Sequence, residues 1–124
     1  MKKYIWVLIF VIFVALVVWL IVTPKRVASS KYDTFAVCIK DSGATFYGAF
    51  WCSHCQSQKK LFGTSEKFLP YVECSTPDGS GQTQICTDKK ITGYPTWIFK
   101  DGSILNGEVA LATLAEKTSC VLPQ

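Results

Sequence analysis

Residues 47–56 read YGAFWCSHCQ, and they contain two of the six cysteines of the chain. Two cysteines, Cys52 and Cys55, are separated by two residues and follow an apolar, aromatic run. The run suits a strand that is buried on both faces, and the composition after it changes to helix-forming residues. We therefore expect a strand over 44–50 and a helix over 52–62, with Cys52 at the N-terminus of that helix.

The spacing of the two cysteines leaves three kinds of site open: a metal site, a structural disulfide or a redox pair. Zinc sites usually combine two closely spaced pairs, so zinc would require His54 and distant cysteines to converge, and no metal is expected. A disulfide between Cys52 and Cys55 would close a very small loop and would stabilise the fold little. A redox pair is therefore favoured.

The expected position of Cys52 gives a physical reason for redox chemistry. Unpaired N–H groups and the dipole at a helix N-terminus stabilise a negative sulfur, and the thiolate is the attacking species in disulfide exchange. His54 adds a group that can donate a hydrogen bond or carry positive charge. Cys55, one turn further on, is placed to resolve a mixed disulfide. The predicted catalytic residues are therefore Cys52, His54 and Cys55.

Four cysteines lie outside this motif. Cys74 and Cys86 flank a glycine-rich loop over 75–81, and a bond between them would contribute about 3 kcal/mol in the chain-entropy model. We expect a structural disulfide there, with a second redox pair that relays electrons to the first as the alternative. Cys38 and Cys120 would tie the two ends of the domain together if they were bonded, and two free buried thiols are the alternative.

Residues 4–22 contain no charge and form nineteen apolar positions in a row. At about 1.5 Å per residue, a helix of this length spans roughly 28 Å, close to the hydrocarbon thickness of a bilayer. Trp6 and Trp19 lie near its ends, where aromatic rings favour the membrane interface. The alternative is a cleavable signal peptide, but its apolar region is usually shorter and is not followed by charges such as Lys25 and Arg26. We expect an uncleaved, single-pass anchor.

The cysteines decide the side of the membrane, because basic residues flank the apolar segment on both sides and give almost no orientation bias. Six cysteines in a soluble part of about 100 residues are typical of compartments outside the reducing cytosol. We expect the C-terminal domain on the extracytoplasmic side of the plasma membrane. The predicted organisation is an anchor over 1–22, a linker over 23–30 and a single domain over 31–124.

The net charge of +4 does not indicate a nucleic-acid partner. Of the thirteen basic residues, Lys2 and Lys3 precede the apolar segment, which leaves eleven basic against nine acidic residues for the rest of the chain. Such a balance is typical of a solvated surface. We expect neither a nucleic acid nor a cofactor.

The segments around the motif predict an α/β domain. Ser30–Asp33 resembles a capping box with Asp in place of Glu or Gln, and apolar residues at helical spacing follow it. An alternating pattern of strands and helices that ends in a hairpin implies a mixed central sheet with helices on both faces. The expected elements are a helix that ends at Gly43, a strand over 44–50, a helix over 52–62 with Gly63 as its stop, a strand over 69–74, a short helix within 82–91, strands over 96–99 and 103–105 around a turn at 100–102, and a helix that contains Leu111, Leu114 and Ala115.

Several motifs together resemble a known family. The chain contains YGAFWCSHC, QKKLFG, YVEC and GYPTW in this order, at 47–55, 58–63, 71–74 and 93–97. They resemble the thioredoxin superfamily, and most closely the DsbA-type thioredoxin-like domains that are associated with bacterial homologues of vitamin K epoxide reductase. The resemblance covers about residues 31–120, and it implies the thioredoxin fold.

The resemblance also implies roles for single residues. Cys52 would be the exposed nucleophile, and Pro95 would follow a cis peptide bond and face the cysteine pair. The backbone before such a proline, at Tyr94, can pair with an extended substrate segment. Trp51, next to the reactive cysteine, is expected to join Tyr94 and Pro95 in docking the substrate, while Phe50 is expected in the core.

The Cys-Ser-His-Cys sequence indicates a redox direction. It resembles the pairs of DsbA-type oxidants, in which a stabilised thiolate favours the reduced form and drives donation of the disulfide. Many enzymes of this fold also carry a buried acid six residues before the first cysteine, which moves the proton of the resolving thiol. That residue is Phe46 here, so the sequence does not identify the proton acceptor.

The predicted function is that of a membrane-anchored thiol–disulfide oxidoreductase of the thioredoxin fold. It would oxidise cysteine pairs in reduced or unfolded exported proteins, and a quinone-linked membrane oxidase resembling vitamin K epoxide reductase would regenerate it. The alternatives are a membrane-tethered reductase or isomerase, and a non-catalytic module that binds client proteins.

Overall fold

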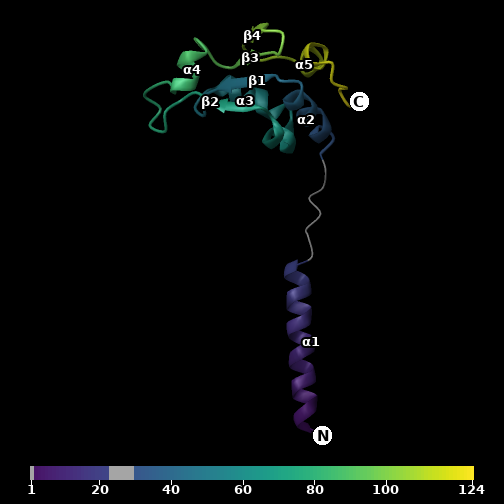
Figure 1. Ribbon diagram of the computed structural model, residues 1–124. Helices are drawn as coiled ribbons and strands as arrows, with labels where there is room; N and C mark the ends of the chain where they lie inside the picture. The colour runs from purple at the N-terminus through teal and green to yellow at the C-terminus, as the bar shows by residue number, and fades with distance from the viewer. Residues whose placement is uncertain (1, 23–29) are drawn as a thin grey trace.

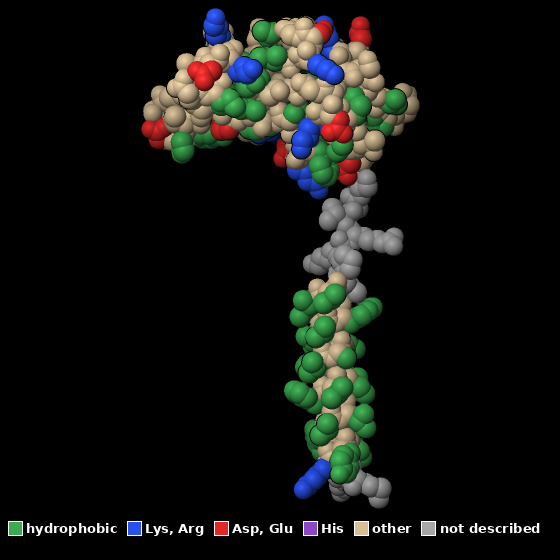
Figure 2. Space-filling view, in the orientation of Figure 1, with side chains coloured by type: hydrophobic (Ala, Val, Ile, Leu, Met, Phe, Trp, Pro, Cys, Tyr) green, Lys and Arg blue, Asp and Glu red, His purple; other side chains and the backbone are tan. Residues whose placement is uncertain are grey.

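The computed structural model describes residues 2–22 and 30–124 of the chain (Figure 1). Helix α1 (Lys2–Val22) comes first, and hydrophobic side chains cover its length in the view of Figure 2. This helix is long and apolar enough to cross a membrane, a property of length and composition that a signal sequence shares. The predicted linker over 23–30 lies, apart from Ser30, outside the described residues.

Four short strands form one mixed sheet in the order β2-β1-β3-β4 (Figure 1). The central strand β1 (Thr45–Gly48) pairs in parallel with β2 (Tyr71–Glu73) and antiparallel with β3 (Thr96–Ile98). β4 (Ile104–Asn106) continues the antiparallel side of the sheet. A parallel pair needs a crossover connection, and an antiparallel pair needs only a tight turn. The arrangement confirms the predicted mixed sheet of the thioredoxin fold.

The helices pack on both faces of this sheet. In Figure 1, α4 lies at one end of the sheet, and α2 and α5 lie at the other. The bounds are Asp33–Asp41 for α2, Ser53–Lys60 for α3, Gly63–Phe68 for the 3-10 helix η1, Gln84–Asp88 for α4 and Leu111–Thr118 for α5.

The larger core lies on the face of the sheet to which Phe46 and Trp97 contribute. The two rings stack with their centroids 4.8 Å apart. Helices α2, α3 and α5 add fully buried side chains to this cluster, among them Ile39, Cys55 and Leu114. Full burial of a large apolar side chain contributes about 1.5–3 kcal/mol, so this face supplies most of the hydrophobic stabilisation.

A smaller cluster lies on the opposite face. Tyr47 contributes to it because successive side chains of a strand point to opposite sides of a sheet. It packs with Cys74, Cys86 and Ile91, and Cys86 comes from α4, so α4 covers this face. The two clusters explain why β1 is apolar at consecutive positions.

Strand β1 is shorter than the predicted strand over 44–50. It ends at Gly48, and the N–H of Cys52 donates a hydrogen bond to the carbonyl of Ala49 at 3.0 Å, which closes a turn. This turn delivers Cys52 to the start of α3 and leaves Phe50 48% exposed. The expectation that Phe50 lies in the core is therefore wrong, because the apolar run continues past the strand into the turn.

Helix α2 begins later than the capping-box pattern suggests. The N–H of Ser30 donates to the Asp33 carboxylate at 3.0 Å, but Tyr32 is the N-cap and the helix starts at Asp33. The second oxygen of Asp33 accepts a hydrogen bond from Ser65 Oγ at 2.7 Å and ties α2 to η1. The sequence does not predict η1, because Gly63, with φ +55°, is typical of a helix end.

Candidate functional site

The two cysteines of the motif lie where β1 is followed by α3. Cys52 is the N-cap of α3, with φ −76° and ψ 116°, and its Sγ accepts a hydrogen bond from the N–H of Cys55 at 3.3 Å. The same Cys52 thiol faces the carbonyl oxygen of Tyr94 at 3.7 Å. A sulfur that accepts an N–H bond at a helix N-terminus is in the position that stabilises a thiolate.

Cys55 is the inner of the two free thiols. None of its surface is exposed, whereas Cys52 keeps 7% of its surface exposed. Burial, reinforced by the hydrogen bond to Cys52, raises the pKa of the Cys55 thiol to about 12. Cys55 is therefore protonated at neutral pH, and Cys52 is the sulfur that another molecule can reach. The expected exposed nucleophile is in fact largely buried, so a reaction partner has to fit closely around it.

His54 extends from the first turn of α3 and is exposed. Its Nδ1–H donates a hydrogen bond to the Glu108 carboxylate at 2.7 Å. A surface pair of this kind stabilises a fold little, so its main effect is to orient the imidazole beside the cysteines. Glu108 is itself positioned through its neighbour Val109, whose N–H and carbonyl bond the buried Gln58 amide at 2.6 and 3.0 Å.

Trp51 and Tyr94 form an aromatic surface beside Cys52. The two rings meet edge to face with their centroids 5.9 Å apart, and Trp51 is 57% exposed. The indole N–H of Trp51 donates to Ser75 Oγ at 2.8 Å, and the Tyr94 hydroxyl accepts from the Gln82 amide at 2.6 Å. These two bonds connect the aromatic surface to the loop that follows β2.

Pro95 follows a cis peptide bond after Tyr94, and its ring is fully buried. The side chain of Pro95 therefore does not form part of an exposed surface. The part of this turn that reaches Cys52 is the carbonyl group of Tyr94. If the turn docks a substrate, the contact comes from its backbone and from the half-buried ring of Tyr94.

Both outer cysteine pairs are bonded in the structure. Cys74 and Cys86 join the end of β2 to α4, with an S–S distance of 1.98 Å, and so close the loop that carries Ser75. Cys38 and Cys120 join α2 to the segment after α5, with an S–S distance of 2.02 Å. One bond thus holds the loop beside the aromatic surface, and the other ties the two ends of the domain together.

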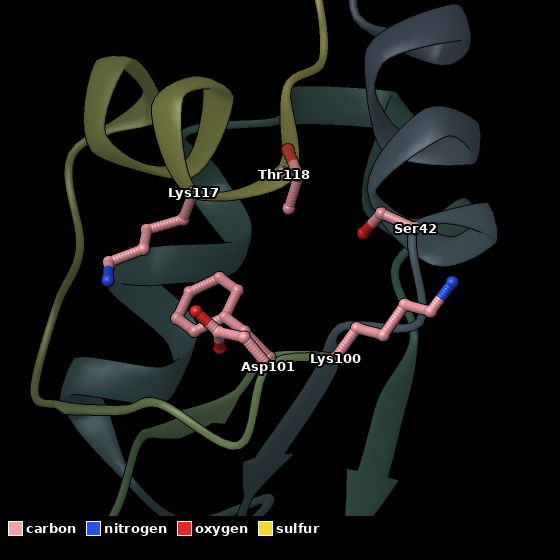
Figure 3. Close-up of a pocket in the computed structure, with 6 residues that line it drawn as sticks. Ser42, Lys100, Asp101, Lys117 and Thr118 are labelled. Carbon is pink, nitrogen blue, oxygen red and sulfur yellow. The ribbon is translucent and has the colours of Figure 1, made fainter.

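No residue of the Cys-Ser-His-Cys motif lines either of two well-formed cavities in the described part of the domain. The first measures about 300 Å³, and Figure 3 shows the ammonium groups of Lys100 and Lys117 turned away from one another around it. The second measures about 340 Å³ and is lined by Lys59, Glu66, Lys67, Leu69 and Tyr71. Among residues 2–22 and 30–124, no group of three or more His, Cys, Asp or Glu side chains is arranged to hold a metal ion.

Glu73 bonds to the segments around the candidate site, and the sequence prediction gave it no role. One of its carboxylate oxygens accepts the N–H of Phe50 at 3.1 Å and the N–H of Ser75 at 2.9 Å. The other oxygen accepts the hydroxyl of Tyr71 at 2.8 Å. Glu73 therefore links the turn before Cys52 to the loop after β2.

Three of the residues that support the cysteine site could have been noticed in the sequence, because they lie within the motifs that resemble the known family. Gln58 opens one motif, and Tyr71 and Glu73 lie in another. Glu108 lies in none of them, and only the fold brings it to His54.

The order of the strands, the cysteine pair at the β1–α3 junction and the Tyr94–Pro95 bond facing Cys52 together define a thioredoxin-like domain. No family model matches the chain. In an alignment over 107 residues that covers 82% of the chain, the sequence is 46% identical to Thiol-disulfide oxidoreductase LTO1 of Arabidopsis thaliana. The chain spans about a quarter of that protein, 26% of its length. The similarity supports placement of the domain in the thioredoxin-like superfamily.

Proposed function

We propose that the chain is a membrane-anchored thiol–disulfide oxidoreductase that oxidises cysteine pairs in exported proteins. The observation that carries the proposal is the position of Cys52, whose sulfur caps α3, accepts the N–H of Cys55 and is the reachable member of the pair. The relative from Arabidopsis thaliana is named a thiol-disulfide oxidoreductase, and its similarity to most of this chain supports the same class of reaction.

The reaction uses the pair in its oxidised form, a Cys52–Cys55 disulfide. A client thiolate attacks Cys52 Sγ, the bond to Cys55 breaks, and Cys55 takes up a proton. A second client thiolate then attacks the client sulfur of this mixed disulfide, and Cys52 leaves as a thiolate. The client loses two electrons and gains a disulfide, and the pair becomes a dithiol such as the one in the structure.

The direction of exchange depends on how well the departing thiolate is stabilised. In the dithiol form, the N–H of Cys55 and the N-terminus of α3 both favour negative charge on Cys52. Stabilising the reduced form makes the disulfide a stronger oxidant. His54, oriented by Glu108, adds a polar group on the same turn. These features support oxidation of clients over their reduction.

The aromatic surface supports binding of unfolded clients. Phe50 and Trp51 are exposed next to Cys52, and the Tyr94 carbonyl lies 3.7 Å from the Cys52 sulfur. An extended client segment along the backbone of Tyr94 would bring its cysteine to Cys52, while its apolar neighbours contact Trp51. The buried ring of Pro95 would then support the turn without touching the client.

The anchor and the outer disulfides support the location and the regeneration that we propose. Helix α1 would hold the domain at the membrane, and the bonds Cys38–Cys120 and Cys74–Cys86 fit the extracytoplasmic side, because disulfides persist outside the reducing cytosol. A quinone-linked membrane oxidase resembling vitamin K epoxide reductase would take electrons from the pair. Anchoring both proteins in one bilayer raises their effective concentration for this step.

Trapping of the mixed disulfide tests the proposed function. A Cys55→Ala variant lacks the thiol that resolves mixed disulfides. Membranes from cells that produce it should therefore accumulate complexes, dissociable by reducing agents, with client proteins and with the regenerating oxidase. The matched control is the Cys52→Ala/Cys55→Ala double variant, which should form no such complex. A Cys55→Ala variant that traps nothing would favour a non-catalytic binding module instead.

A further inference from the structure

Every reaction of the pair moves a proton at Cys55, which is fully buried and has a pKa of about 12. Its thiol loses a proton when it attacks Cys52, and regains one when the bond between the two sulfurs breaks. The position expected to supply an acid for this transfer holds Phe46, whose ring has neither a proton to give nor a place to accept one. A polar group near Cys55 is therefore needed.

Tyr71 lies beside Phe46 in the sheet. The two residues are in register on β2 and β1, and their rings meet edge to face at 5.1 Å. A Cβ on Gly48 would stand 3.0 Å from Cys55 Sγ and 3.4 Å from the hydroxyl oxygen of Tyr71. The nearest atom to such a Cβ is Tyr71 Cε2, at 2.8 Å, so the absence of a side chain at Gly48 lets the Tyr71 ring and the Cys55 sulfur both approach this point of β1.

The hydroxyl of Tyr71 also contacts a carboxylate. It donates a hydrogen bond to Glu73 Oε2 at 2.8 Å, while Glu73 Oε1 accepts the N–H groups of Phe50 and Ser75. Glu73 is only half-buried, and its bond to Phe50 lies at the exposed surface, so the carboxylate can exchange protons with solvent. Glu73 thus lies between the Tyr71 hydroxyl and solvent, and the Tyr71 hydroxyl lies on the side of Gly48 that the Cys55 sulfur also approaches.

We propose that Tyr71 and Glu73 carry the proton of Cys55, in place of the acid that the chain lacks at Phe46. This inference rests on the proposed function, because only a reacting pair has to move that proton. When Cys55 attacks the mixed disulfide, its S–H proton passes to the Tyr71 oxygen while the Tyr71 hydroxyl proton passes to Glu73. Cys55 Sγ bonds to Cys52 Sγ, and the partner sulfur leaves as a thiolate. Both protons move in reverse when the Cys52–Cys55 bond is broken.

The electrostatics of Tyr71 fit a group that passes a proton on and does not store charge. Its burial raises the pKa of the Tyr71 hydroxyl most, and the hydrogen bond to Glu73 and the negative charge of Glu73 raise it further. The phenol therefore stays protonated between transfers. Each transfer changes the charges of Glu73 and Cys55 and leaves Tyr71 neutral.

The charged groups of the neighbouring helices complete this environment. From α3, Lys59 Nζ lies 3.5 Å from the centre of the Tyr71 ring, and its charge favours the thiolate of Cys55. From η1, Glu66 and Lys67 line the cavity of about 340 Å³ that Tyr71 also borders. The cation of Lys59 is thus near the thiolate at the moment when the proton leaves.

A thiol reaction with two phases separates proton transfer at Cys55 from the nucleophilic attack of Cys52. The full chain in detergent micelles, with its Cys52–Cys55 pair reduced, is mixed with the aromatic disulfide dithiobis(nitrobenzoate). The first coloured thiolate released reports the attack of Cys52. The second reports the attack of Cys55 on the resulting mixed disulfide. Both rates are measured as a function of pH.

Three variants enter the comparison. Tyr71→Phe removes the hydroxyl and keeps the ring. Glu73→Gln removes the proton acceptor, yet its amide oxygen can still accept the N–H groups of Phe50 and Ser75. Tyr47→Phe is the matched control, because it removes a hydroxyl from a buried tyrosine that packs on the opposite face of the sheet.

In Tyr71→Phe we expect the first phase to keep its wild-type rate and the second to slow about 10²-fold near neutral pH, the size of a lost general acid–base contribution. The difference should shrink as the pH rises toward the pKa of Cys55, because hydroxide then removes the proton. Glu73→Gln should slow the second phase in the same way, and Tyr47→Phe should change neither phase.

An unchanged second phase in Tyr71→Phe overturns the proposal, and so does an equal slowing of both phases, which a purely structural role would produce. An unaffected Glu73→Gln variant overturns the part given to Glu73. Failure of the proposed function looks different, because the Cys55→Ala variant would then trap no client protein while the wild-type chain still releases both thiolates.

Discussion

A Cys52→Ser variant is expected to lose oxidation of a reduced dithiol peptide, with the rate falling to that of the uncatalysed exchange. Serine can keep the N-cap hydrogen bond of α3, but its oxygen cannot form the mixed disulfide. Cys55 does not replace the missing sulfur, because it is fully buried and its pKa is raised to about 12. The measurement is peptide oxidation by the full chain in micelles, with far-UV circular dichroism as a check of folding.

The matched variant for this experiment is Cys55→Ser, which keeps the reachable sulfur and loses the resolving one. Mixed with the disulfide form of the peptide, it should form a stable adduct through Cys52, and it should show no turnover. The assignment of Cys52 as the nucleophile would be contradicted if the Cys52→Ser variant retained turnover. It would also be contradicted if the Cys52→Ser variant formed an adduct through Cys55.

Removal of the Cys38–Cys120 bond is expected to lower the free energy of unfolding by about 4–5 kcal/mol. The bond joins residues that are 82 positions apart, so it restricts the unfolded chain strongly. It also ties α2, whose Phe35 and Ile39 are buried in the larger core, to the segment after α5. The double variant Cys38→Ala/Cys120→Ala, unfolded by denaturant as the full chain in micelles, measures the loss.

The second outer bond gives the comparison for this prediction. Cys74 and Cys86 are only 12 positions apart, so the Cys74→Ala/Cys86→Ala variant should lose less, about 3 kcal/mol. A larger loss for the shorter loop than for the longer one would contradict the view that both bonds act mainly by restricting the unfolded chain.

Much of the fold could be predicted because local pattern and tertiary packing agree in this domain. Phe46 and Tyr47 are both apolar because β1 separates two clusters, which is the property that the apolar run predicted. The turn over 100–102 likewise joins two strands at the expected place, because Gly102 can adopt its positive φ of +80° without strain.

The parts of the fold that could not be predicted depend on contacts between distant segments. Phe50 continues an apolar run, but the turn that presents Cys52 places Phe50 outside the sheet. Gly63 has the conformation of a helix end, yet η1 follows because Ser65 bonds Asp33, 32 positions away. No local pattern records such a bond.

The candidate site shows the same division. The placement of Cys52 and Cys55 where a strand is followed by a helix could be predicted, because it depends on local sequence patterns. Their polar partners could not, since Glu108 reaches His54 across 54 positions and Glu73 reaches the N–H of Phe50 across 23. Hydrogen bonds of this range are set by the fold, and the sequence contains no periodicity that reports them.

The reduction potential of the Cys52–Cys55 pair is the most direct test of the central claim that the pair is an oxidant. The full chain is equilibrated with glutathione buffers of known composition, and the dithiol and disulfide forms are counted after alkylation. The hydrogen bond to the Cys52 sulfur and the N-terminus of α3 stabilise the dithiol form. We therefore predict a potential of about −120 to −180 mV, the range from DsbA to protein disulfide isomerase. A value near about −270 mV, that of thioredoxin, would mean that the pair donates electrons, and would contradict the claim.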